Sequence, residues 1–257
     1  MQVDFDLFIN EYIIIKNDIG NVIDKFRFDG EKLVKLKQNN LESKQLGKIK
    51  PKDEYQVCLV DALLNNYNNN NNIVLVQGRA GSGKSLFCLH YCFHALDKNI
   101  IDKIIIIVNP LVTRNAAKMG FYPGSKDEKL LDSFIGNMLI SKLGSKIELL
   151  RLLDREIELL PVGDIGGYET EKRSILYLPE AQNYSIDLMK LILQRVGDNT
   201  KVLIDGDLCS QVDLKEFEGA NNGMKRLSEV FHNESLYFEV ELKNIYRSKI
   251  GLIADKM

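Results

Sequence analysis

Short apolar runs alternate with longer periodic segments over most of the chain. The runs are too short for helices and are rich in β-branched residues, which favours strands. They occupy residues 73–76, 104–108, 157–160, 175–178, 202–204 and 236–242. Segments with helical periodicity lie between them, at 86–96, 128–139 and 188–196. Continuous apolar strands flanked by helices predict an α/β fold with a mostly parallel sheet that is buried on both faces.

The N-terminal segment follows a different pattern. Three short apolar-rich runs, at 12–16, 22–28 and 33–36, are separated by turn sequences, one of which is Asp29-Gly30. Asp-Gly favours a hairpin because the turn positions need positive φ. We therefore expect a small antiparallel β-meander, too short to be stable alone, that packs on the main domain.

A lysine-rich stretch joins the two parts. Its six lysines are Lys35, Lys37, Lys44, Lys48, Lys50 and Lys52. A solvated linker is the simplest interpretation, and a strip that contacts phosphates is the alternative. We expect residues 1–47 to form the β-rich segment with this linker, and residues 48–257 to form the α/β domain. A helix over 53–65 and a surface loop in the asparagine tract 66–72 are expected at the start of that domain.

Composition narrows the class of protein. With 45% hydrophobic and 27% charged residues among 257, the chain is an ordinary globular protein. A net charge of −2 leaves no overall electrostatic footprint for nucleic acid, so a polyanion would need a local patch. Four cysteines without a Cys-x-x-Cys pair predict no disulfide framework. The longest apolar run, 104–108, is far shorter than a membrane span, and no basic leader precedes it, so a cytoplasmic protein is expected.

One loop carries the strongest chemical signal. Residues 73–85 read Ile-Val-Leu-Val-Gln-Gly-Arg-Ala-Gly-Ser-Gly-Lys-Ser and contain the pattern G-x-x-x-x-G-K-[ST]. Its glycines let backbone N–H groups wrap a phosphate, its lysine places a charge against the β- and γ-phosphates, and its serine hydroxyl contacts Mg²⁺. The sequence therefore predicts nucleotide binding with Mg²⁺. The residues expected at the nucleotide are Gly78, Arg79, Ala80, Gly81, Ser82, Gly83, Lys84, Ser85 and Leu86.

A second strand ends in an acidic residue. The run 175–178 leads through Pro179 to Glu180, at the carboxyl end of the strand, where ligands bind in open α/β sheets. Enzymes with this phosphate loop need such a residue, and Glu180 is expected to orient the attacking water. Pro179 stands where an aspartate usually contacts the metal. Capping of the following helix is the simpler alternative for Glu180.

A third strand leads to Asp205-Gly206-Asp207. Asp207 is expected to accept a hydrogen bond from a water on Mg²⁺, and Gln211 to sense the γ-phosphate. A turn without a function is the alternative, since Asp and Gly favour turns. We also consider that Asp205 or Asp207 makes the metal contact that Pro179 cannot make.

In their order along the chain, these motifs resemble the PhoH family, P-loop ATPases related to the first motor domain of superfamily-one helicases. The resemblance covers about residues 48–257. The matching stretches are Lys-Pro-Lys-Asp-Glu-Tyr-Gln (50–56), the loop 78–85, Gly-Phe-Tyr-Pro-Gly-Ser-Lys-Asp-Glu-Lys (120–129), Glu-Ala-Gln-Asn (180–183), Arg-Val-Gly (195–197), Gly206-Asp207 with Gln211, and Tyr-Arg-Ser (246–248). The β-rich leader is similar to the segment before the ATPase in longer relatives with a PIN nuclease. No PIN sequence accompanies it here, so nuclease activity is not expected.

The resemblance implies roles for individual residues. Gln56 would contact adenine, and Lys84 and Ser85 would hold phosphate and Mg²⁺. Glu180 would activate water and Gln211 would sense the γ-phosphate. Arg247 is a candidate arginine finger, in cis or for a neighbouring subunit, with a plain surface arginine as the alternative. Besides Pro179, the departures are Asn109-Pro110, where many relatives have Arg-Pro, and one extra residue before Gln211.

The function implied is ATP hydrolysis with a RecA-like, helicase-like domain, coupled to binding or remodelling of RNA or DNA. With one motor domain, such action would need a homo-oligomer, and a hexameric ring is the expectation by resemblance. The alternative is a nucleotide-gated binding or assembly module in which Pro179 has impaired hydrolysis. A small-molecule kinase fits the Glu-Ala-Gln-Asn and Gly-Asp motifs badly.

Overall fold

The computed structural model describes residues 6–65, 71–109, 134–153, 155–170, 173–208 and 221–246. Within these residues, a six-stranded sheet forms the centre and every neighbouring pair of its strands is parallel. In spatial order the strands are β11 (Tyr237–Leu242), β6 (Ile73–Gly78), β10 (Thr200–Gly206), β9 (Ser174–Leu178), β7 (Lys103–Val108) and β8 (Ile157–Pro161). The predicted parallel α/β sheet is confirmed. Part of the predicted helix 128–139 lies outside the described residues.

Both faces of this sheet are covered. Successive side chains of a strand point to opposite faces. Val74 and Val76 of β6 therefore join one hydrophobic cluster, and Leu75 joins the other. All residues of β9 and β10 are buried. This double burial explains why the strands appear in the sequence as continuous apolar runs.

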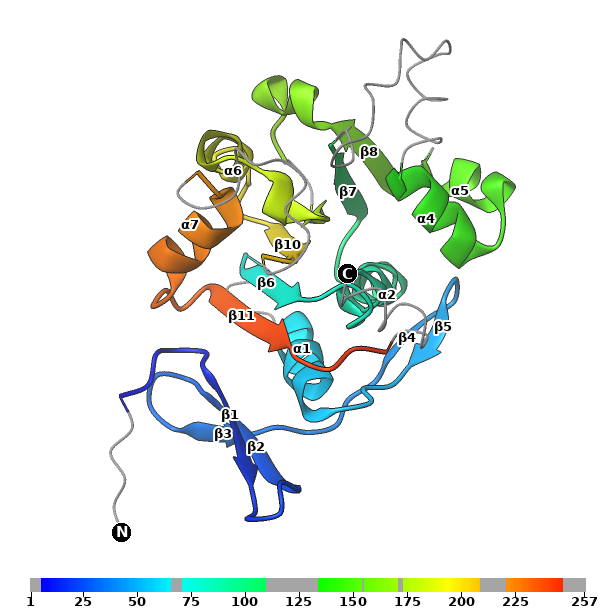
Figure 1. Ribbon diagram of the computed structural model, residues 1–257. Helices are drawn as coiled ribbons and strands as arrows, with labels where there is room; N and C mark the ends of the chain where they lie inside the picture. Colours follow the sequence, from blue (N-terminus) through cyan, green and yellow to red (C-terminus); the bar gives the residue numbers. More distant parts are fainter. Residues whose placement is uncertain are drawn as a thin grey trace, which may run out of the picture.

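Helices form the outer layers (Figure 1). The first cluster packs against α1 (Glu54–Leu64), α2 (Lys84–Asp97), α4 (Phe134–Leu143) and α5 (Lys146–Leu153). The second packs against α6 (Ile186–Leu193), α7 (Gly223–Phe231) and the 3₁₀ helices η2 (Val162–Gly167) and η3 (Ala181–Asn183). Two layers of helices around a parallel sheet leave the strand ends as the place where polar residues gather.

The N-terminal meander is confirmed. It consists of β1 (Tyr12–Lys16), β2 (Val22–Phe28) and β3 (Leu33–Lys35), antiparallel and in that spatial order. It is anchored to α1 through Asp61, whose Oδ2 accepts hydrogen bonds from Tyr12 Oη and Arg27 Nε, each at 3.0 Å. The small sheet thus packs on the main domain, as its length requires.

The lysine-rich stretch differs from a plain linker. It contains a hairpin of β4 (Leu41–Ser43) and β5 (Gly47–Ile49), and the second strand crosses the boundary expected between residues 47 and 48. Leu41 is fully buried, and the main chain beside it is held by α2, since Asp97 Oδ2 accepts from Lys44 N at 2.6 Å. The apolar residues between the lysines pack this stretch on the main domain, which the lysine-rich pattern did not indicate. The six lysines themselves are exposed.

A buried lysine ties β10 to the end of α1. Lys201 is completely buried, and its Nζ donates to Leu63 O at 2.5 Å, Asn65 O at 2.9 Å and Tyr91 Oη at 3.2 Å. The last carbonyls of a helix have no partner within the helix, so the amino group of Lys201 replaces a C-terminal cap. Burial lowers the pKa of Lys201 to about 7.

We predict that Lys201→Met lowers the free energy of unfolding by about 2 kcal/mol, because Leu63 O loses its buried donor and Asn65 O keeps only the one from Asn72 Nδ2. Urea unfolding measures this, with the exposed Lys98→Met as the control. In the unfolded chain the lysine has a pKa near 10.5, so between about pH 7 and 10.5 the unfolded state binds more protons at this residue than the folded state. The free energy of unfolding of wild type therefore rises with pH in this range. The difference between wild type and Lys201→Met should grow from pH 7 to pH 10. A difference as small as that of the control would contradict the capping role.

Candidate nucleotide-binding site

The loop between β6 and α2 has the backbone that a phosphate cradle needs. Gly78, Gly81 and Gly83 have φ values of 150°, 87° and 100°. Gly83 is the left-handed residue that precedes the first turn of α2, and a Cβ on Gly78 would lie 2.7 Å from Leu242 O. Only glycine combines such φ values with this close approach. The loop therefore brings its main-chain N–H groups to the positive end of a helix.

Lys84 points back into the loop. The residue is 5% exposed, and its Nζ donates to Gly78 O at 2.6 Å and to Arg79 O at 3.4 Å. Ser82 Oγ is buried without a hydrogen-bond partner among the described residues. An ammonium, a hydroxyl in need of a partner and a helix N-terminus make a donor set that fits a phosphate group. Arg79 and Gly81 are exposed, whereas Ala80, Ser85 and Leu86 are half-buried.

Gln56 connects α1 to this loop. Its buried side chain donates from Nε2 to Ser82 O at 3.1 Å and accepts at Oε1 from Lys52 N at 2.8 Å. Its main-chain N–H donates to Asp53, the N-cap of α1. The structure thus places Gln56 at the wall of the loop, and its predicted contact with adenine stays a prediction.

Tyr246 is a residue of this wall that the sequence motifs did not single out. Its N–H donates to Gly81 O at 2.9 Å, its hydroxyl donates to Asp53 Oδ2 at 2.6 Å, and Lys52 Nζ lies 5.0 Å from its ring centroid. Partial desolvation and the bond to Asp53 raise its pKa to about 12. Tyr246 belongs to the Tyr-Arg-Ser stretch, in which the family resemblance implies a role only for Arg247.

Glu180 follows β9 in an unusual conformation. Its φ and ψ are 53° and 42°, which cost energy for a residue with a Cβ. Its carboxylate accepts from Gln182 Nε2 at 2.7 Å, and its N–H donates to Asp205 Oδ1 at 3.2 Å. The strained turn aims a half-buried carboxylate from the end of the strand.

Asp205 organises this part of the site. It is fully buried, and its second oxygen accepts from Tyr177 Oη at 2.5 Å. Burial, followed by the charge of Asp205, raises the pKa of Tyr177 well above its ordinary value, so this tyrosine stays protonated as a donor. Both oxygens of Asp205 thus have donors from β9 and the turn after it. The geometry makes it a positioning residue for Glu180.

The end of β10 is locked to η3 through Gln182. Asp207 N donates to Gln182 Oε1 at 3.1 Å. A Cβ on Gly206 would lie 2.5 Å from Met224 Sδ and 2.8 Å from Gln182 Oε1, so a larger residue there would displace the Gln182 side chain that accepts from Asp207 N. Asn222 Nδ2 donates to Gln182 O at 2.9 Å, which joins α7 to the same network. Asp207 itself is 1% exposed.

The fold brings the three predicted clusters together. β10 lies between β6 and β9, and all three run parallel, so the phosphate loop, Asp207 and Glu180 lie at one edge of the sheet. Gln211, Arg247 and the block 120–129 lie outside the described residues. The described part of the chain holds no group of three or more His, Cys, Asp or Glu side chains that could bind a metal. The expected Mg²⁺ ligands, Ser85 and Asp207, remain a prediction.

A phosphate loop between a parallel strand and a helix, with a carboxylate at the end of a neighbouring strand, defines the class of P-loop NTPases. The family model described as "PhoH-like protein" matches residues 48–253. The chain belongs to the PhoH family. No described helix has the length and apolar character needed to cross a membrane.

Relatives span a wide range of bacteria. Protein PhoH2 of Bacillus subtilis (strain 168) is 25% identical over 256 residues, which cover 95% of this chain and 55% of the relative. The PhoH-like protein of Mycobacterium tuberculosis (strain ATCC 25618 / H37Rv) is 30% identical over 191 residues, with 72% and 50% covered. This chain therefore spans about half the length of the curated relatives it matches. Among solved structures, Pif1 helicase from Candida albicans is similar with a TM-score of 0.40 and 14% identity, over 80% of this chain and 43% of that one.

We predict that Glu180→Gly is more stable than Glu180→Ala by about 1 kcal/mol, because both remove the carboxylate but only glycine relieves the left-handed backbone. Thermal and urea unfolding measure the difference. The same pair of substitutions at Glu148, in the first turn of α5, is the control and should show the opposite order, because alanine favours a helix more than glycine does. Equal stability of the two Glu180 variants would mean that the turn is not strained.

Proposed function

We propose that this protein binds ATP with Mg²⁺ and hydrolyses it. The observation that supports this most strongly is the placement of Glu180 and of the Lys84 loop at the ends of strands separated only by β10. A carboxylate held near a phosphate cradle can position a water molecule for attack on a terminal phosphate. The conformation of Glu180, maintained through Asp205, suits a residue whose exact direction matters.

Each residue of the site has a part in this proposal. Lys84 and the N–H groups of the loop bind the β- and γ-phosphates, and Ser82 Oγ supplies a further donor. Ser85 and Asp207 hold Mg²⁺, which neutralises phosphate charge when bound. Glu180 accepts a hydrogen bond from the attacking water. Gln211 and Arg247, which lie outside the described residues, are proposed to sense the γ-phosphate and to stabilise developing charge.

The base is proposed to lie along the wall formed by Gln56 and Tyr246. Tyr246 is 44% exposed although its main chain and hydroxyl are both fixed, so its ring is held in place with a face available for stacking. The side-chain amide of Gln56 keeps one hydrogen and one lone pair beyond its bonds to Ser82 and Lys52, which suit a purine edge. By the family resemblance this contact favours ATP.

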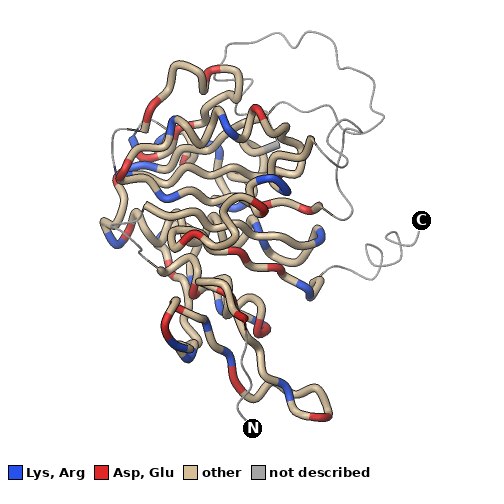
Figure 2. Tube along the Cα trace, turned by 90° about the vertical axis from the view of Figure 1, so that its left-hand side faces the viewer, with Lys and Arg blue, Asp and Glu red and all other residues tan. Residues whose placement is uncertain are grey.

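Coupling to nucleic acid is the further part of the proposal. Charges of both signs are interspersed along the described trace (Figure 2), so RNA or DNA would need a local basic surface. The exposed lysines between residues 35 and 52 offer one. Motor action by a single domain would require a homo-oligomer, for which we propose a ring. Arg247 would then act either in its own nucleotide site or in that of a neighbouring subunit.

We expect wild type to release phosphate from ATP-Mg and single-stranded RNA to raise the rate. Glu180→Gln should lower turnover by about 100-fold or more, because a neutral amide oxygen still accepts a hydrogen bond from the water but cannot take its proton, while ATP binding persists. Lys84→Ala should lose both binding and turnover, and Lys98→Ala, an exposed lysine after the same helix, should lose neither. A steady-state phosphate assay and calorimetry measure these quantities. If wild type binds ATP but releases no phosphate above the Lys84→Ala background, a hydrolysis-impaired, nucleotide-gated module replaces the ATPase.

Tyr246→Ala should weaken ATP binding by about tenfold through loss of a stacking surface. Tyr246→Phe keeps the ring and loses only the bond to Asp53, so its affinity should stay near that of wild type. Calorimetric titration with ATP and GTP compares the variants. Equal losses in the two would assign the effect to the Asp53 bond, and equal affinity of wild type for ATP and GTP would remove the preference ascribed to Gln56.

A further inference from the structure

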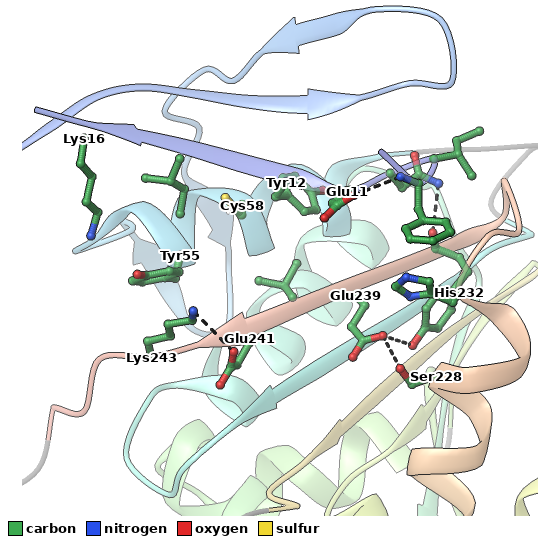
Figure 3. A pocket seen from close by; sticks show the side chains of 16 residues that line it. Glu11, Tyr12, Lys16, Tyr55, Cys58, Ser228, His232, Glu239, Glu241 and Lys243 are labelled. Carbon is green, nitrogen blue, oxygen red and sulfur yellow. Dashed lines mark hydrogen bonds and ion pairs between the residues drawn. The ribbon is translucent and has the colours of Figure 1, made fainter. Parts of the chain in front are cut away.

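Two open strand edges face each other on the outer side of β11, the strand that pairs with β6. β1 is the outer strand of the small sheet, and β11 is the outer strand of the large one. Figure 3 shows β1 running alongside β11, with β2 and β3 on its far side. Between them lies a groove of about 510 Å³, with Tyr55 and Cys58 of α1 among its lining residues. A strand edge carries main-chain groups that need partners, and two such edges form this groove.

On the side of β11, alternate residues turn their main chain toward the groove. Ile73 N donates to Leu236 O, so the even-numbered residues of β11 bond to β6 in the parallel ladder. Glu239 and Glu241 therefore direct their N–H and C=O groups away from β6. Tyr237, the residue before them in this series, already has partners, because its N–H donates to Glu234 O and its carbonyl accepts from Asn10 Nδ2 at 3.0 Å.

The edge of β1 is open in the same way. Phe28 N donates to Glu11 O, and the antiparallel register pairs Ile13 with Phe26. Hydrogen-bonded pairs alternate in such a ladder, so Tyr12 and Ile14 direct their main-chain groups away from β2. The groove thus offers donors and acceptors on both of its long sides.

Asn10 closes one end and sets the distance between the two edges. It is buried in the left-handed region with φ 65°, and its Nδ2 donates to both Ser235 O and Tyr237 O. Its Oδ1 accepts from Arg27 Nη1 at 2.9 Å. A side-chain amide here replaces the strand pairing that would otherwise join β1 to β11. Beyond it the two strands remain without a main-chain ladder between them.

The charge of the lining selects the chemistry of an occupant. Its carboxylates are Glu11, Glu239 and Glu241, against the ammonium groups of Lys16 and Lys243. Both ammonium groups already have a carboxylate partner, Lys16 with Glu54 at 2.9 Å and Lys243 with Glu241 at 3.8 Å. An excess of carboxylates repels the phosphates of a nucleic acid and attracts a cationic ligand. Tyr12, Ile14 and Tyr55, which are half-buried, add apolar surface between the charges.

We propose that this groove binds one extended, basic peptide segment of a partner protein, which adds a strand between β11 and β1. Its main chain pairs with Glu239 and Glu241, and its basic side chains lie near Glu11 and Glu241. Its apolar side chains pack toward Ile14 and Tyr55. The proposal is independent of nucleotide hydrolysis.

The test uses the full chain and a synthetic peptide of alternating lysine and valine. Fluorescence anisotropy measures its affinity, and amide NMR follows Glu239 and Glu241. Binding should shift these two amides and slow their hydrogen exchange. A peptide with glutamate in place of lysine should bind at least about tenfold more weakly. The lysine peptide methylated at alternate main-chain nitrogens keeps every side chain but loses donors, and its affinity should fall by a similar factor.

A matched pair of variants tests the edge itself. Glu241→Pro removes an N–H that faces the groove and leaves the ladder to β6 in place, because proline is tolerated on such an edge. It should weaken peptide binding by about tenfold, whereas Glu241→Gln, which keeps the N–H, should weaken it by only about two- to threefold. Urea unfolding of both variants checks the fold, and the methylated peptide tests the same point on the wild-type chain.

Three results would overturn the proposal. The first is absence of peptide binding, and the second is equal affinity for the lysine, glutamate and methylated peptides. The third is displacement of the peptide by oligouridylate with shifts at Glu239 and Glu241, which would assign the groove to single-stranded nucleic acid.

Discussion

The rest of the site depends on the hydrogen bonds that the buried carboxylate of Asp205 accepts from Tyr177 and from the N–H of Glu180. Asp205 lies at the end of β10, between the strand of the phosphate loop and the strand of Glu180. A carboxylate without solvent is costly unless donors surround it, and Tyr177 and the N–H of Glu180 are those donors. Their arrangement holds Glu180 in a conformation that it would not adopt alone. Asp205 thus sets the direction of the Glu180 carboxylate, which is the group proposed to act in catalysis.

The phosphate loop is supported by segments that are distant in the sequence. Gln56 reaches it from α1, Tyr246 from the chain after β11, and Leu242 packs against Gly78. The N-terminal sheet is fixed to the same two elements, to α1 through Asp61 and to β11 through Asn10. The small sheet, which lies entirely outside the region matched by the family model, is therefore connected to the walls of the nucleotide site by two short paths.

Features that depend on neighbours along the chain were predictable. The strands could be recognised because burial on both faces requires continuous apolar runs, and the loop Gly78–Ser85 because its chemistry needs fixed residue types at fixed spacing. The hairpin of β4 and β5 was not predicted, because Leu41 is an isolated apolar residue in a lysine-rich stretch and its burial depends on α2. The contacts of Lys201 and Tyr246 could not be predicted from the sequence. The partners of Lys201 are more than 100 positions away, and those of Tyr246 are more than 150 positions away.

The sequence by itself determined the parallel α/β class, the N-terminal meander, the phosphate loop and the membership that its motifs indicated. Each follows from local patterns, since side-chain periodicity and glycine conformation act over a few residues. The tertiary structure alone decided that Asp205 faces Tyr177 and Glu180, that Tyr246 flanks the loop, and that β1 and β11 leave two edges open. These arrangements arise from the order of strands in the sheet, because spatial neighbours in a parallel sheet are separated by long crossovers in the chain.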